Sequence, residues 1–404
     1  MMAGSEIPNA PSTVATVRTG ADRLLTDAPE IIRNKRVGVL TNHTGRLSDG
    51  RHLVDAIVDS GIASLSVLFG PEHGITGTTP DGEVVDHSNH SRYNVPIFSL
   101  YGKTHKPTKE MLHDVDVLVC DIQDVGARFY TFISTIALAL EAAAENDVPF
   151  VVLDRPNPIR GLRCEGPVRE QSLKTFVAWM PMPVTHGLTI GELTRMWNGE
   201  GWLANGVRAR LEILPMKGWK REMWFDQTGL PWIPPSPNMQ RLSTATVYPG
   251  VCFIEGTSIS EGRGTSSPFE LIGAPWADPE KVLAELSAFE TPGVSFSAEE
   301  FTPLEIPGTA SEPKYENELC RGIRITIADR DAIEPVKLGV EIIAAFKRAH
   351  PTETELRQRR FDILTGSSSV RKKLEANVHP AEICSMWKPE LEKFCELREK
   401  YFLY

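Results

Sequence analysis

Apolar runs that end in polar loops recur along the first part of the chain. Residues 115–120 (VDVLVC) are almost continuously apolar, which is typical of a parallel strand buried on both faces. Residues 35–40 and 149–153 have the same character, and segments with helical spacing of apolar residues lie between such runs. Strands that alternate with helices predict a doubly wound sheet. The sequence therefore predicts an α/β protein with a mostly parallel sheet.

The length of the chain favours two domains, because 404 residues exceed what one hydrophobic core usually supports. Residues 219–242 are rich in Trp and Pro, so we expect a long surface loop at the domain boundary. The alternation of strands and helices resumes near Thr244, and residues 251–254 are expected to form a strand. We predict one domain over residues 17–243 and a smaller α/β domain over residues 244–404.

Composition excludes several classes of protein. The net charge of -10 argues against a nucleic-acid partner, and no run approaches the roughly 20 apolar residues of a membrane span. No G-x-G-x-x-G follows a strand and no P-loop motif occurs, so no cofactor is expected. The N-terminus is polar and lacks the apolar core of a signal peptide, which predicts either a cytoplasmic protein or one whose leader has been removed.

The stretch 65–77 (LSVLFGPEHGITG) carries the strongest candidate for acid–base chemistry. An apolar strand stops at Gly70-Pro71, and Glu72 and His73 follow at once. In an open α/β sheet, ligands bind in the crevice at the carboxyl ends of the strands. Glu72 is thus the leading acid or base, although it could instead accept hydrogen bonds from loop amides or pair with His73.

Other strand-end loops should converge on the same edge of the sheet. Three aspartates in these loops could take part in catalysis or could cap the next helix: Asp121, Asp124 and Asp154. Three loop arginines could hold an anionic substrate or pair with those aspartates: Arg128, Arg155 and Arg263. Tyr130 could stack on a sugar ring or pack in the core.

Residues 86–90 (DHSNH) offer side chains that bind metals, but the spacing supplies no third ligand. We therefore interpret Asp86–His90 as a polar loop and expect no metal site. A metal-dependent hydrolase that uses His73, His87 and His90 is the alternative.

Several long motifs occur in an order that resembles one family. They are TNHTG (41–45), LFGPEHG (68–74), DIQDVGARFYT (121–131), LDRPNP (153–158), THGLTIGEL (185–193) and EGTSISEGRGTSSPFE (255–270). The chain resembles the NamZ-like exo-β-N-acetylmuramidases, formerly a family of unknown function, from about Val37 to the C-terminal YFLY. The resemblance implies a glycosidase with a Rossmann-like N-terminal catalytic domain and a smaller C-terminal domain closing the cleft.

The resemblance also implies a substrate and a leading residue. Members of the family release N-acetylmuramic acid from the non-reducing ends of peptidoglycan fragments, and the Glu of GPEHG corresponds to Glu72. Peptidoglycan fragments or muramyl sugars are therefore the expected partners. Many relatives carry an export signal, which is not visible here. A non-catalytic binder of cell-wall sugars that uses the same cleft is a second reading.

Glycosidic cleavage usually needs an acid for the leaving oxygen and a second group at the anomeric carbon. We predict Glu72 as the acid, with Asp121 or Glu261 as the second carboxylate. The acetamido oxygen of the sugar could replace that second group, which would then only orient it. The lactyl carboxylate of muramic acid would suit Arg128 or Arg263. Further residues expected to contact substrate are Asn42, His43, His73, Tyr130, Asp154, Arg155, Asn157 and His186.

Overall fold

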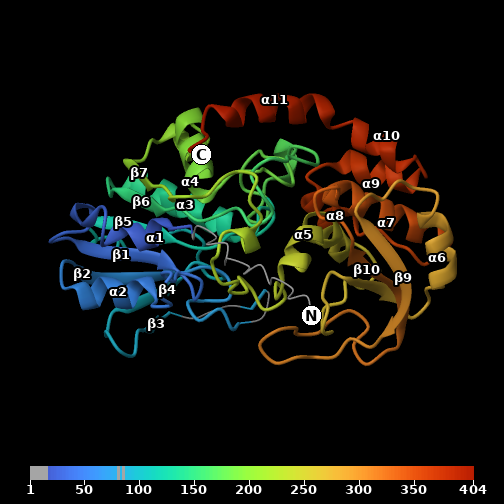
Figure 1. The fold of residues 1–404 in the computed structure, drawn as a ribbon, viewed down its shortest axis with the longest axis horizontal. Helices are drawn as coiled ribbons and strands as arrows, with labels where there is room; N and C mark the ends of the chain where they lie inside the picture. The colour runs from blue at the N-terminus through green and yellow to red at the C-terminus, as the bar shows by residue number, and fades with distance from the viewer. Residues whose placement is uncertain (1–16, 80–81, 84–86) are drawn as a thin grey trace, which may run out of the picture.

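The computed structural model describes residues 17–79, 82–83 and 87–404. Within them lie a seven-stranded sheet in the N-terminal part of the chain and a three-stranded sheet in the C-terminal part. Figure 1 shows the two halves side by side, with helix α5 (Leu242–Val251) between them. The predicted α/β class, with a mostly parallel first sheet, is confirmed.

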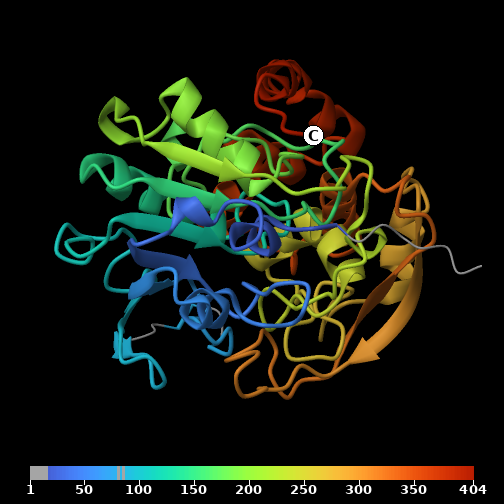
Figure 2. The same cartoon turned by 60° about the vertical axis from the view of Figure 1, so that its left-hand side comes forward.

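The first sheet has the strand order β3-β4-β2-β1-β5-β6-β7. All neighbours are parallel except the β3–β4 pair. Its strands are β1 (Arg36–Thr41), β2 (Ser64–Gly70), β3 (Ser88–Asn89), β4 (Pro96–Ser99), β5 (Val117–Asp121), β6 (Phe150–Leu153) and β7 (Leu211–Leu214). The carboxyl ends of the parallel strands therefore share one edge, and in Figure 2 their arrowheads point toward the C-terminal half.

Alternate residues of the central strands pack on opposite faces of this sheet, as a strand period of two requires. Val37 and Val39 of β1 join the core beneath α1 (Gly20–Leu24) and α2 (Leu53–Ser60). Leu40 joins the core beneath α3 (Phe132–Glu145) and α4 (Ile190–Glu200). Helices cover both faces, which explains the nearly continuous apolar runs in β5 and β6.

The second half is built around an antiparallel sheet in the order β8-β10-β9, formed by Leu271–Ala274, Cys320–Ile327 and Val294–Phe301. Its helices are α6 (Pro279–Leu286), α7 (Pro335–Ala349), α8 (Gln358–Thr365), α9 (Ser368–Glu375) and α10 (Pro380–Ser385). Glycines let α5 lie directly on α7, because a Cβ on Gly250 would sit 1.8 Å from the carbonyl oxygen of Pro335. In the described part of the chain, no helix has the length and apolar character to cross a bilayer.

Two local predictions in the connecting region are wrong. Residues 251–254 form the end of α5 and the start of a 3-10 helix (Cys252–Gly256) instead of a strand. A short helical segment that is apolar and buried on all sides cannot be distinguished from a strand by the periodicity of its sequence. The Trp-rich stretch is irregular, as expected, but Trp219 and Trp224 are buried instead of lying on the surface. Trp219 packs edge-on against Tyr404, close to the C-terminus.

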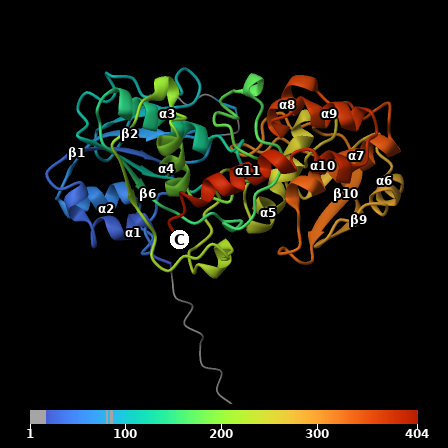
Figure 3. The same cartoon turned by 90° about the horizontal axis from the view of Figure 1, so that it is seen from above.

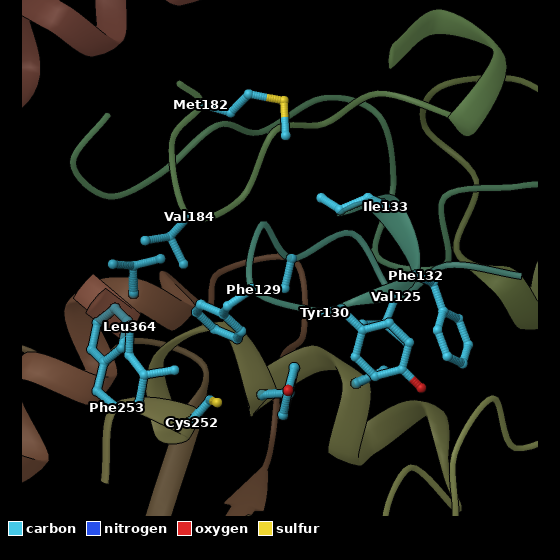
Figure 4. Packing of buried hydrophobic residues seen from close by; sticks show 14 of the residues in the cluster. Val125, Phe129, Tyr130, Phe132, Ile133, Met182, Val184, Cys252, Phe253 and Leu364 are labelled. Carbon is cyan, nitrogen blue, oxygen red and sulfur yellow. The ribbon is translucent and has the colours of Figure 1, made fainter. Parts of the chain in front are cut away.

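One hydrophobic cluster runs across the junction between the two halves. In Figure 4, Phe129 and Val184 of the first half lie against Phe253 and Leu364 of the second. The fully buried guanidinium of Arg128 is part of this contact. It donates hydrogen bonds to the carbonyl oxygens of Pro167, Met182 and Leu364, the last from the second half. The junction is thus packed and hydrogen-bonded like the interior of a single domain.

The C-terminal segment returns to the first half. Helix α11 (Lys388–Glu399) spans the two halves, as Figures 1 and 3 show. Near its end, Arg398 donates to the carbonyl oxygens of Leu162 and His186. The Tyr404 hydroxyl donates to Asp154 and accepts a hydrogen bond from the backbone of Met216. The segment predicted as the end of the second domain therefore makes its final contacts with the first.

A buried carboxyl at the junction makes stability depend on pH. Glu165 accepts a hydrogen bond from the backbone N–H of Val336, the second residue of α7, and 13% of its side chain is exposed. Burial raises the pKa of Glu165 from 4.5 to about 8. Between these values the native state holds a proton that the unfolded chain has lost, so the free energy of unfolding falls as pH rises.

We expect Glu165→Gln to remove this contribution, because an amide does not titrate. The stability of the variant relative to wild type should rise between about pH 5 and pH 8, by up to about 1.4 kcal/mol per pH unit. Urea unfolding at several pH values measures the difference. Glu396→Gln, at an exposed position of α11, serves as the control. A difference for Glu165→Gln that stays constant across this window would contradict the prediction.

Candidate active site

A cavity of about 400 Å³ lies where the carboxyl ends of β2 and β4 meet the second half. The first half contributes Glu72, His73, Gly82, Tyr101, residues 129–131 and Val177 to its lining. The connecting stretch and the second half contribute Ser236, Asn238, Met239, Tyr248, Cys252, Glu255, Glu261, Arg263, Phe269, residues 309–314, Arg360 and Leu364. The volume is that of a small-molecule site, and neither half forms it alone.

Glu72 is held in this cavity by neutral hydrogen-bond donors. Its Oε2 accepts a hydrogen bond from the Thr131 hydroxyl at 2.5 Å, and its Oε1 accepts one from the Gly82 backbone N–H at 3.0 Å. Tyr101 also hydrogen-bonds Glu72; burial, together with the charge of Glu72 and this bond, raises the pKa of the Tyr101 phenol. These donors come from separate loops, so they fix the position of the carboxyl group.

The turn that presents Glu72 depends on residues with positive φ. His73 adopts φ 69° and Gly74 φ 71°, which reverses the chain directly after the strand. Gly77 lies under the ring of His43, where a Cβ would come within 1.9 Å of Nδ1. The glycines of this motif therefore serve the backbone path and the close packing of the preceding loop.

His73 lines the cavity as a buried imidazole. Its Nδ1 lies 2.6 Å from the carbonyl oxygen of Thr79, which assigns the ring proton to Nδ1. Burial lowers the pKa of His73, against an opposing effect of the Glu72 charge. The ring is thus favoured in its neutral form.

The second half brings a cluster of paired charges to the cavity. Glu261 lies 3.0 Å from the ammonium of Lys314 and 3.6 Å from Nε of Arg263. Glu255 accepts hydrogen bonds from Arg263 at 2.9 Å and from Arg360 at 2.5 Å. Burial raises the pKa of Glu255, and burial lowers the pKa of Arg263 to about 10. The wall of the cavity therefore presents both carboxylates and cations, and the cations could contact an anionic ligand.

Five of the residues predicted for the site lie together in this cavity: Glu72, His73, Tyr130, Glu261 and Arg263. The others predicted for it do not line the cavity: Asn42, His43, Asp121, Arg128, Asp154, Arg155, Asn157 and His186. Their side chains stabilise the loops at the sheet edge instead, for the reasons that follow.

Asp121 and Arg155 bind each other beside the cavity. The carboxylate of Asp121 is fully buried and lies 2.5 Å and 3.0 Å from two guanidinium nitrogens of Arg155. Arg155 also donates to the carbonyl oxygen of Arg46. Both oxygens of Asp121 are used in this ion pair, so Glu261 is the better placed of the two candidates for a second carboxylate.

Asp154 lies at the start of α4. It accepts hydrogen bonds from Gly191 N–H and the hydroxyls of Thr189 and Tyr404, while burial raises its pKa to about 6. This is the capping role that the sequence left open.

The remaining polar residues make local bonds. Asn157 donates to the carbonyl oxygen of Leu188, and Nδ1 of His186 accepts from the N–H of the same residue. Asn42 holds Thr44 within its own loop. His43 contacts the Pro234 carbonyl oxygen. The two terminal nitrogens of Arg128 donate to the three carbonyl oxygens at the junction.

Several cavity residues escaped the sequence analysis, namely Tyr101, Thr131, Glu255, Lys314 and Arg360. Tyr101 directly follows residues 94–100 (NVPIFSL), whose strand-like character was a usable signal for a position at the sheet edge. Glu255 opens the 255–270 motif. Lys314 and Arg360 belong to the second half, and the sequence offers no pattern that places them against Glu72.

The alternative metal ligands do not converge. Among the described residues, no three His, Cys, Asp or Glu side chains form a group that could hold a metal ion. His87 accepts a hydrogen bond from Ser99, and the ring of His90 stacks on Tyr93. Asp86 lies outside the described residues.

Comparison with protein families gives two matches that follow one another along the chain. The N-terminal model of exo-β-N-acetylmuramidase NamZ matches residues 37–243, and the C-terminal model matches residues 246–404. The chain belongs to the NamZ family. The family resemblance predicted from the motifs is thereby confirmed.

Relatives within the NamZ family share nearly the whole chain. The peptidoglycan β-N-acetylmuramidase NamZ of Bacillus subtilis (strain 168) is 43% identical over 389 residues, which are 96% of this chain and 91% of that protein. A crystal structure of a DUF1343 family protein from Bacteroides fragilis matches with a TM-score of 0.87 and 36% identity, over 96% and 99% of the two chains. A second one matches with a TM-score of 0.77 and 32% identity, over the same shares.

We expect Asp121→Asn to act on stability and not on substrate binding. The change leaves the buried Arg155 charge without its partner, which should lower the free energy of unfolding by about 3–5 kcal/mol. Urea unfolding measures this loss, and KM for a muramyl substrate should stay at the wild-type value for the folded protein. Asp116→Asn, in an exposed pair with Arg36, should change stability by about 1 kcal/mol or less. Lost turnover with unchanged stability would instead assign Asp121 to catalysis.

Proposed function

We propose that this protein is an exo-β-N-acetylmuramidase that releases N-acetylmuramic acid from the non-reducing ends of peptidoglycan fragments, with Glu72 as the general acid. Membership of the NamZ family supports the activity, as does the B. subtilis relative, which is a peptidoglycan β-N-acetylmuramidase. The observation that carries the assignment of Glu72 is its place in the cavity between the halves, where neutral donors orient its carboxyl group.

A general acid must hold its proton at a fixed point beside the leaving oxygen. Thr131 and Gly82 each bind a different oxygen of Glu72, so rotation of the carboxyl group is restricted. These donors are uncharged, and they therefore compensate the burial of Glu72 without a direct cation. Asp121 is the opposite case, because it is bound by a guanidinium.

Glu261 supplies the second carboxylate in this proposal. Glu261 lies in the cavity 3.0 Å from the ammonium of Lys314, where a carboxylate could act at the anomeric carbon or orient the acetamido group. Arg263 lines the same cavity, and its guanidinium can pair with the lactyl carboxylate of muramic acid. The negatively charged substrate would thus meet the cations of this charged cluster, which are Arg263, Lys314 and Arg360.

We expect Glu72→Gln to lower kcat/KM for a muramyl disaccharide by a factor of about 10²–10⁴, the usual contribution of general acid catalysis. The loss should be much smaller for 4-nitrophenyl N-acetylmuramide, because nitrophenolate leaves without being protonated. Steady-state kinetics on both substrates measure the two factors. Glu396→Gln, at an exposed position of α11 away from the cavity, is the control. Equal rates for the Glu72 variant and wild type on the disaccharide would refute the assignment.

We expect Glu261→Gln to lower turnover of both substrates by similar factors, because the step at the anomeric carbon is common to them. Glu255→Gln is the matched comparison: it releases Arg263 and Arg360, so its main effect should be a higher KM. Wild-type turnover in the Glu261 variant, with an unchanged unfolding midpoint, would show that Glu261 is dispensable.

A further inference from the structure

We infer that Phe176 and His105 form a stacking surface for the sugar on the leaving-group side of the bond that is cut. This inference rests on the proposed function, in which Glu72 protonates the glycosidic oxygen. It adds a binding site for the first sugar of the leaving group, which the cavity around Glu72 does not include.

The two rings lie next to the acid through Tyr101. The ring centroids of His105 and Phe176 are 4.1 Å apart with an interplanar angle of 23°, so the rings are stacked. Each lies 5.9 Å from the ring of Tyr101, which lines the cavity and hydrogen-bonds Glu72. Val177, the residue after Phe176, also lines the cavity. The aromatic pair is therefore at the border of the cavity, beside Glu72.

Burial distinguishes this pair from ordinary core packing. Phe is among the residues most often fully buried, and the Phe residues around the junction have almost no exposed surface. Phe176 and His105 are only half-buried, so part of each ring meets solvent. His105 makes one further contact: its Nδ1 lies 3.4 Å from the carbonyl oxygen of Leu100, the residue after β4. An aromatic ring that is half exposed and backed by a second ring suits the apolar face of a sugar.

The chemistry of an acid-catalysed cleavage fixes the occupant. A general acid lies next to the oxygen that joins the two sugars, within hydrogen-bond reach. One sugar occupies the cavity with the charged cluster, and the next must then leave past Glu72. Tyr101 adjoins Glu72, and Phe176 and His105 adjoin Tyr101, so the ring of this second sugar meets them on its way out of the cavity. The Phe176–His105 surface therefore contacts the leaving sugar and not the muramic acid.

Phe176→Ala tests the inference with two substrates. One is the disaccharide of N-acetylmuramic acid linked β-1,4 to N-acetylglucosamine, and the other is methyl β-N-acetylmuramide, whose leaving group has no ring. We expect kcat/KM for the disaccharide to fall about tenfold, in line with the energy of an aromatic contact. For the methyl glycoside it should stay at the wild-type value. Phe176→Tyr should keep wild-type kinetics, and Phe176→Leu should behave as the Ala variant does.

Each other outcome has a definite meaning. Equal losses on both substrates would overturn the inference, because Phe176 would then only support Tyr101 and Glu72. Unchanged kinetics on the disaccharide would overturn it as well. Failure of wild type to cleave the disaccharide would refute the proposed function instead, so the two failures are distinguishable. Unfolding midpoints of all variants identify any that fold poorly, and His105→Ala with the same two substrates then provides the second measurement.

Discussion

The contact between the two halves is the constraint on which the rest of the structure depends. Arg128 is fully buried and satisfies carbonyl oxygens from both halves, and burial lowers its pKa to about 9. A buried cation in an apolar junction persists only if its donors are paired. The surrounding aromatic packing of Phe129 against Phe253 excludes water from the same place. Because the halves are fixed here, side chains far apart in the sequence enclose one cavity.

Strand order brings the loops after β2 and β4 together at that cavity, and the longer loop after β5 reaches it as well. A parallel sheet puts all carboxyl ends on one edge, and this much followed from the apolar runs in the sequence. The order of the strands, however, places the ends of β2 and β4 next to each other and leaves the loops after β1 and β6 further along the edge. Crossover connections are not encoded in local periodicity, so Tyr101 could not be paired with Glu72 in advance. For the same reason, Asp121 and Asp154 were equally eligible as site residues.

The second half was harder to predict. Proline and a capping aspartate are local signals of a helix start, and α6 begins at Pro279 after Asp278 while α7 begins at Pro335. Residues 251–254 were wrongly predicted to form a strand, because a helix that is buried on all sides has no separate polar face and so lacks the helical pattern of an amphipathic segment. Lys314 and Arg360 reach the cavity from a loop and from a short helix, and their position depends on the packing of the halves. Tertiary contacts of this kind have no counterpart in the sequence pattern.

The buried carboxylates at this sheet edge differ in the partners that hold them. Asp121 is neutralised by a guanidinium, and Asp154 is enclosed by donors with no exposed surface. Neither can exchange a proton with a ligand without losing bonds that hold a loop. Glu72 is bound by a hydroxyl, a phenol and a backbone amide, and it still borders an open volume. Donors from three separate loops therefore fix the position of the Glu72 carboxyl group at the border of that volume.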